Sequence, residues 1–164
     1  MSNFTVISIP TIKGQTTIKG YKDGLEIMGF NYGMSIAVAS GITNSERTTG
    51  KPHFSEISFS RYSDSATPQL MQACAGGTVL KGDTVLTMAR FDEKGAVLPL
   101  IVFTLKNVVI SNLSVSGGGD VPMESISLTY SHIQVAYDVQ KAEGGKEGLV
   151  AFKFDLATNV LESK

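Results

Sequence analysis

The chain has 164 residues, and we expect residues 1–164 to form a single domain because this length needs no division. Hydrophobic residues make up 42% of the chain and charged residues 18%, a balance that supports a packed core and excludes a disordered chain. The 14 basic and 15 acidic side chains leave a formal charge of −1 without any cluster of Lys and Arg. Nucleic acid is therefore not an expected partner.

The cysteine content and the amino terminus bear on where the chain is made. Cys74 is the only cysteine, so no intramolecular disulfide can form and we expect folding in a reducing compartment. Residues 1–8 lack the charged and long apolar regions of a Sec signal. The longest apolar run, Val97–Phe103, is far shorter than the ~20 residues of a membrane helix. We expect a cytoplasmic product that does not insert into membranes and that would leave the cell only by another route.

In chain order, most segments repeat with a period of two, which is typical of half-buried strands. Many of them carry β-branched residues and are separated by Gly, Asp or Asn, which favours an antiparallel sandwich or barrel. The predicted strands are Phe4–Ile9, Leu25–Val38, Ile57–Ser60, Val79–Phe91, Val97–Val109, Ile110–Val115, Ile126–Tyr130 and Val150–Leu156.

The apolar phase shifts by one residue between two of these segments. Even positions are apolar up to Tyr130, and odd positions are apolar from Ile133 onward. A one-residue shift moves every side chain to the other face of a sheet unless the chain bends. We therefore predict a bend near Ser131 and His132.

Residues 67–76 interrupt the strand pattern and predict a short α-helix. Thr67 is a candidate to cap the first amides, and Pro68 suits the first turn. Gly76 or Gly77 can provide a left-handed residue at the carboxyl end. Cys74 lies four residues after Leu70 on the expected apolar face, so we expect a buried, unreactive thiol.

The polar segment at residues 39–52 predicts a long projecting loop. It is flanked by Gly and ends at Pro52, and loops of this length in compact domains usually serve a function or lack order. A mobile surface loop and a partner-contacting arm are the two interpretations, and the arm is favoured. The polar turn at residues 116–120 is interpreted as a plain connector.

Catalytic and metal-binding patterns are weak in this chain. His53 and His132, with one cysteine, do not make a conventional three- or four-ligand zinc site. Gly117–Gly119 lacks the spacing of a phosphate-binding loop and no helix pattern follows it. We therefore expect no enzymatic activity and no cofactor.

Six blocks of the sequence form a pattern that spans nearly the whole chain: Ile12–Thr16, Leu25–Ser35, Phe59–Gly77, Leu105–Ser111, Ile133–Ala142 and Phe154–Asn159. In their order and spacing, these blocks resemble the hemolysin-coregulated protein family, the inner-tube proteins of bacterial type VI secretion. The segment that spans the predicted helix is the most specific of them. The chain has Tyr32 and Phe154 where the family usually has Trp.

The resemblance implies a mainly β, two-sheet, barrel-like domain with one helix. It implies a structural subunit that forms hexameric rings. The rings are expected to stack into a tube that is exported by the type VI apparatus and can carry effectors in its lumen. The implied partners are further copies of the chain, the spike protein, the sheath and effector proteins. The implied lumen residue for cargo contact is Asn31. The long loop is expected to reach a neighbouring subunit in the next ring through Thr43, Asn44, Glu46, Arg47 and Lys51.

Two other classes of protein fit the composition. A monomeric β-sandwich that binds a ligand or carbohydrate would present aligned exposed aromatic side chains, whereas this chain has no Trp and five Tyr. An enzyme on a cupin-like barrel would need a metal triad, which two histidines do not readily supply. The size of the native particle distinguishes a ring from either alternative.

Overall fold

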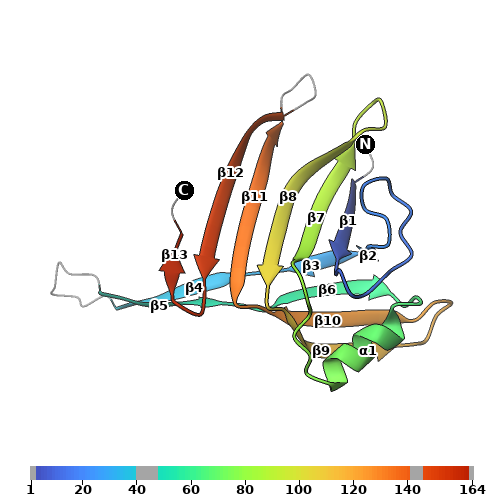
Figure 1. The fold of residues 1–164 in the computed structure, drawn as a ribbon, viewed down its shortest axis with the longest axis horizontal. Coiled ribbons are helices and arrows are strands. Elements are labelled where there is room, and N and C mark those ends of the chain that lie inside the picture. Colours follow the sequence, from blue (N-terminus) through green and yellow to red (C-terminus); the bar gives the residue numbers. More distant parts are fainter. Residues whose placement is uncertain (1–2, 40–47, 141–145, 163–164) are drawn as a thin grey trace.

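The computed structural model describes residues 3–39, 48–140 and 146–162, in which strands predominate and a short helix lies at one end (Figure 1). The strands form a large sheet, a small sheet packed against it, and a hairpin that extends away from both. This confirms the mainly β fold with two principal sheets that the sequence predicted.

The large sheet is antiparallel, with the strand order β13-β12-β11-β8-β7-β1-β2. Its central strands alternate buried and more exposed side chains, because one face covers the core. The bounds are β1 (Asn3–Ser8), β2 (Leu25–Ile27), β7 (Thr84–Phe91), β8 (Val97–Lys106), β11 (His132–Gln140), β12 (Lys146–Asp155) and β13 (Val160–Leu161).

The small sheet has the strand order β3-β6-β10-β9 and is also antiparallel. In β6, the residues at odd positions are buried and those at even positions are less buried or exposed, as a sheet with one covered face requires. The bounds are β3 (Gly29–Asn31), β6 (Ile57–Tyr62), β9 (Val109–Ser116) and β10 (Met123–Thr129).

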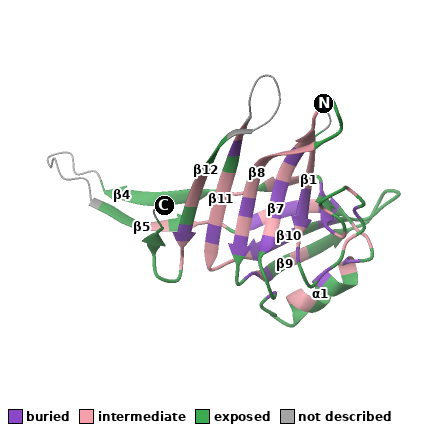
Figure 2. Ribbon diagram, turned by 45° about the horizontal axis from the view of Figure 1, so that its top comes forward, coloured by how far each residue is buried: buried purple, intermediate pink, exposed green. Residues whose placement is uncertain are grey.

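The core lies between the facing sides of these two sheets. Leu86 and Leu105 of the large sheet and Ile57 and Ile126 of the small sheet are fully buried in one hydrophobic cluster. Each such side chain removes enough apolar surface from water to contribute about 1.5–3 kcal/mol. Figure 2 shows the buried residues concentrated in the central strands, while the projecting hairpin is exposed.

The hairpin consists of β4 (Met34–Ala39) and β5 (Thr48–Phe54), which pair only with each other in the described sheets. Strand β5 begins at Thr48, inside the predicted loop 39–52, and belongs to the hairpin that extends away from both sheets, whereas residues 40–47 lie outside the described ranges. Thr48 and Thr49 are β-branched residues that suit a strand, and they pair with Ala39 and Val38. The loop prediction therefore missed a strand whose polar composition hid its extended conformation.

The predicted bend at Ser131 and His132 is confirmed, and it marks the passage from one sheet to the other. Strand β10 ends in the small sheet at Thr129, and β11 begins in the large sheet at His132. Because the two strands cover the core from opposite sides, the apolar phase must change between them. A change of sheet explains the shift, without a bulge at this point.

Helix α1 (Thr67–Ala75) confirms the predicted helix and lies at the β9 edge of the small sheet. Leu70 of this helix is fully buried, and Gly77, just after the helix, has a φ of 56°, the left-handed conformation that ends it. The predicted cap at Thr67 is wrong, because Ala66 is the N-cap residue and makes no side-chain cap. Cys74 is partly buried against the core and not fully enclosed, because its turn of the helix lies near the surface.

None of the helical segments within the described ranges combines the length and the apolar composition needed to cross a membrane.

Candidate assembly surfaces

The first candidate surface is an apolar strip on the projecting hairpin, which we define as Met34, Ile36 and Val38 of β4. Alternate residues of a strand share one face, and each of these side chains leaves about half of its surface exposed. At the base of the hairpin, the ring of Phe54 lies 4.6 Å from that of Phe154 in β12. The hairpin is thus anchored at its base, and its apolar strip is left in contact with water.

Two of the predicted site residues can be placed relative to this hairpin. Lys51 lies on β5 and is exposed. The predicted loop residues Thr43, Asn44, Glu46 and Arg47 lie outside the described residues. Among residues 34–39 and 49–54, Lys51 is the only Lys, Arg, Asp or Glu.

The second candidate surface is the outward face of the small sheet, which carries hydroxyl and amide groups. Asn31 is exposed on β3 and lies opposite Ser58 of β6. The hydroxyls of Ser58 and Ser127 are 2.9 Å apart across the β6–β10 pair, and Ser60 lies opposite Ser125 in the same register. Asn31 therefore belongs to a flat polar face that carries no charge at these positions.

The third candidate surface is a groove at the far end of the small sheet, which we call the Gly-rich groove. It has a volume of about 510 Å³. Tyr62 and Val121 each leave about half of their surface exposed within it, and Asp120 is its only charged residue. The turn that forms much of it was predicted as a plain connector. The groove is lined by Tyr62, Ser116, Gly117, Gly118, Gly119, Asp120, Val121 and Met123.

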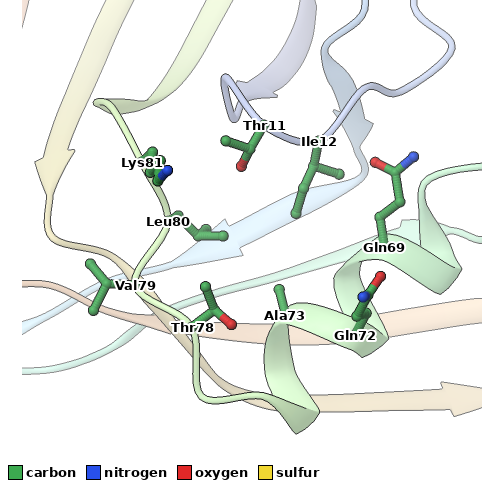
Figure 3. A pocket seen from close by; sticks show the side chains of 9 residues that line it. All are labelled: Thr11, Ile12, Gln69, Gln72, Ala73, Thr78, Val79, Leu80 and Lys81. Atoms are coloured by element: carbon green, nitrogen blue, oxygen red, sulfur yellow. The ribbon is translucent and has the colours of Figure 1, made fainter.

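The fourth candidate surface is a hollow of about 530 Å³ between helix α1 and the segments around Ile12 and Leu80 (Figure 3). Gln69 and Gln72 project into it from the helix, and Lys81 lies on its opposite side. Its wall is a mixture of amide and apolar groups without a cluster of acids or bases. It offers a shallow contact surface.

A buried charge cluster holds helix α1 against the small sheet. Arg61 of β6 and Glu124 of β10 are each only 1% exposed. The Arg61 guanidinium pairs with Asp64, and its Nε lies 3.8 Å from Oε2 of Glu124. The hydroxyl of Thr67 donates to Glu124. This bond explains why Thr67 does not cap the helix, since a buried carboxylate requires donors.

The histidines and the cysteine are not brought together. His53 is exposed on the hairpin, whereas Nε2 of His132 lies 3.1 Å from Oδ2 of Asp155. Hydrogen bonds from Thr158, further amide hydrogen bonds and His132 lower the pKa of Asp155. Within the described ranges, no group of three or more His, Cys, Asp or Glu side chains could hold a metal ion.

Sequence reasoning missed the apolar strip, the Gly-rich groove and the hollow beside helix α1. The alternation of Met34, Ile36 and Val38 is visible in the sequence, but there it predicts part of one long strand, Leu25–Val38. The structure divides this stretch among β2, β3 and β4, which belong to three different sheets. The signal that could have located the apolar strip is the pair of interruptions at Met28 and Gly33.

Comparison with known proteins identifies the family. The family model described as "Type VI secretion system effector, Hcp" matches residues 6–137. Protein hcp1 of Pseudomonas aeruginosa is 32% identical over 157 residues, which cover 94% of this chain and 95% of that protein.

Solved structures show the same fold. A type six secretion system protein superposes with a TM-score of 0.89 at 21% identity, over 98% of this chain and 100% of that chain. Hcp1 from Salmonella typhimurium superposes with a TM-score of 0.78 at 19% identity, over 99% and 100% of the two chains. By family model, sequence identity and coverage, this chain belongs to the Hcp family of type VI secretion system proteins.

Proposed function

We propose that copies of this chain close into hexameric rings, and that the rings stack into the inner tube of a type VI secretion system. The tube is exported by that apparatus and carries effector proteins in its lumen. The spike protein and the sheath are the other partners in this proposal. Membership of the Hcp family supports a role as a type VI tube protein. The hairpin that extends from the subunit supports assembly.

The observation that carries the proposal is the apolar strip on the hairpin. Met34, Ile36 and Val38 are exposed side by side on a two-stranded ribbon that joins neither large nor small sheet. An isolated two-stranded ribbon is marginally stable in water, and contiguous exposed apolar side chains mark contact sites. The hairpin is explained if another subunit covers it.

The sheets also offer edges for assembly. The small sheet ends at β3 on one side and β9 on the other, and edge strands carry backbone groups that can pair with another chain. A ring requires a heterologous interface, in which two different patches of the subunit meet with a rotation that closes. The β3 edge and the β9 edge, where helix α1 lies, are two dissimilar patches of the kind that such an interface needs.

The lumen wall in this proposal is the outward face of the small sheet, with Asn31 in contact with cargo. Hydroxyl and amide groups at Asn31, Ser58, Ser60 and Ser125 form hydrogen bonds with many protein surfaces. A face without charge neither repels nor retains cargo through long-range forces. This chemistry suits a channel through which proteins must also pass.

The experiment is to determine the mass of the native particle and to image the purified protein by negative-stain electron microscopy. The proposal predicts rings of six subunits, together with stacks of rings at high protein concentration. A monomer that binds a saccharide would refute the proposal and support a β-sandwich binding module.

A further inference from the structure

A pocket of about 430 Å³ lies at the margin of the proposed lumen wall, where strand β5 passes into β6. It adjoins Asn31, the residue proposed to contact cargo, and Ser58, which lies opposite Asn31 in the small sheet. We call it the Glu56 pocket. It is lined by Asn31, His53, Phe54, Ser55, Glu56 and Ser58.

Glu56 gives the pocket its permanent charge. Among the described residues that line it, Glu56 is the sole Asp, Glu, Lys or Arg, and it is exposed. The ion pairs found within the described ranges do not involve Glu56. Lys51, two residues before His53 on β5, does not line the pocket. The carboxylate of Glu56 is therefore open to a cation from outside the subunit.

The other polar groups of the pocket can accept hydrogen bonds from the same cation. The side-chain oxygens of Asn31 and Ser58 are acceptors, and a neutral imidazole at His53 offers an acceptor nitrogen. Phe54 adds an aromatic ring, along which the methylene groups of a Lys or Arg side chain can pack. Lys and Arg side chains donate hydrogen bonds and accept none. The pocket is thus matched to a cationic side chain and repels a carboxylate.

Hydrogen bonds around Ser55 hold the backbone of the pocket in place. The N–H of Ser55 donates to the carbonyl of Gly33 at 2.9 Å, and the N–H of Gly33 donates to the Ser55 hydroxyl at 2.8 Å. The carbonyl of Ser55 accepts from the Tyr130 hydroxyl at 2.8 Å. Because Glu56 follows directly, its backbone is positioned before a ligand arrives, which lowers the entropic cost of binding.

From this geometry we propose that the Glu56 pocket binds Lys and Arg side chains on the surface of cargo proteins. The inference rests on the proposed tube and names the chemical group that its wall holds. One exposed ion pair is weak, so a single pocket releases its ligand readily. The copies of the pocket in a hexameric ring act together on one cargo molecule, and avidity strengthens the hold.

Saturation-transfer NMR with two small probes tests the charge preference of the pocket. Nα-acetylarginine amide carries a guanidinium, and Nα-acetylcitrulline amide has nearly the same shape without the charge. Each probe is titrated against the assembled wild-type protein. We expect the arginine probe to bind about two- to fivefold more tightly than the citrulline probe, as one exposed ion pair allows. Equal binding of the two probes would overturn the proposal.

Two variants assign the binding to this pocket. Glu56→Gln removes the charge with little change of shape, and should lower the affinity for the arginine probe to that for the citrulline probe. Glu93→Gln is the matched control, because Glu93 is also exposed but lies in the turn between β7 and β8, away from β6 (Figure 1). It should bind both probes as the wild-type protein does. An equal loss in the two variants would overturn the proposal, since it would indicate general attraction to surface carboxylates.

The state of assembly distinguishes cargo from another copy of the chain as the occupant. The arginine probe should bind to rings as well as to dissociated subunits. Binding to dissociated subunits alone would show that a neighbouring copy fills the pocket, and would reject a cargo site there.

Export of cargo provides an independent measurement. Glu56→Gln should reduce the amount of co-exported effector relative to the wild-type protein and to Glu93→Gln, and Glu56→Lys should reduce it further. The same proteins are imaged by negative-stain electron microscopy. Intact rings with unchanged effector export in both Glu56 variants would reject the cationic cargo site alone, whereas absence of rings in the wild-type protein would reject the proposed function as well.

Discussion

At the scale of single residues, the buried cluster of Arg61, Asp64 and Glu124 is the most consequential feature. It places a guanidinium and a carboxylate in the interior, where each ion costs several kcal/mol to desolvate. The cost is offset by pairing, and by the hydroxyl of Thr67, which ties the first residue of α1 to β10. The cluster therefore fixes the position of the helix on the small sheet.

Removal of Arg61 should be costly because it leaves Glu124 buried without its cation. We expect Arg61→Met to lower the free energy of unfolding by about 3–5 kcal/mol, measured by urea denaturation. The double variant Arg61→Met/Glu124→Met removes both charges and should recover most of this loss. A double variant whose loss equals the sum of the two single losses would contradict the coupling of these charges.

Substitution of Cys74 tests how closely helix α1 packs on the core. Because the thiol is only partly buried, we expect Cys74→Ser to lower the free energy of unfolding by about 1 kcal/mol. Cys74→Ala, which adds no hydroxyl, is the control and should cost less. Thermal denaturation of both variants checks this order, and a more stable Ser variant would show that the thiol lies in a polar environment.

Substitution of Asn31 tests whether the outward face of the small sheet contacts cargo. Asn31→Arg adds a long cation to an exposed position, so the free energy of unfolding should change by no more than about 0.5 kcal/mol. Rings should form, but the amount of co-exported effector should fall. Asn31→Ser, which keeps a hydroxyl, should retain cargo. Loss of the ring in the Arg variant would instead place Asn31 in a subunit interface.

At the scale of elements, the hairpin has a different role from the strands around it. The strands of the two sheets bury one face in a common core, whereas β4 is exposed along its length. Loop closure costs only about 0.6 kcal/mol per doubling of loop length. The segment between β4 and β5 can therefore be shortened with little effect on the subunit.

Replacement of residues 40–47 by a short Gly-Ser turn should preserve the folded subunit and reduce the stacking of rings, because the proposed contacts of Thr43, Asn44, Glu46 and Arg47 are removed. Sedimentation velocity and secretion assays measure the two effects. Ser35→Ala, a small change on the other face of β4, is the control and should assemble normally. Normal stacking and export of the shortened variant would return this segment to the class of plain surface loops.

At the scale of the whole molecule, assembly and stability should be linked. A contact that forms only between folded subunits stabilises them by mass action. The apparent melting temperature of the wild-type protein should therefore rise with protein concentration, as measured by differential scanning fluorimetry. The variant Ile36→Ser/Val38→Ser should show a weaker dependence. A wild-type melting temperature that is independent of concentration would argue against an assembled native state.

The sequence by itself determined the type of most elements. The alternation in Ile57–Ser60 and the residues Pro68, Leu70 and Gly77 predicted a strand and a helix that the structure confirms. These features are local, because a period of two or the backbone preference of Gly and Pro depends only on near neighbours. The phase shift at Ser131 likewise recorded a change of sheet.

Only the tertiary structure decided which faces are covered and which remain exposed. Met34, Ile36 and Val38 have the same alternation as a core strand, yet they stay about half exposed in a ribbon that joins neither of the two packed sheets. Thr67 is a residue type that often caps a helix, but its hydroxyl donates a hydrogen bond to the carboxylate of Glu124, 57 residues away. Burial and hydrogen-bond partners depend on segments distant in the chain, so a pattern of near neighbours cannot contain them.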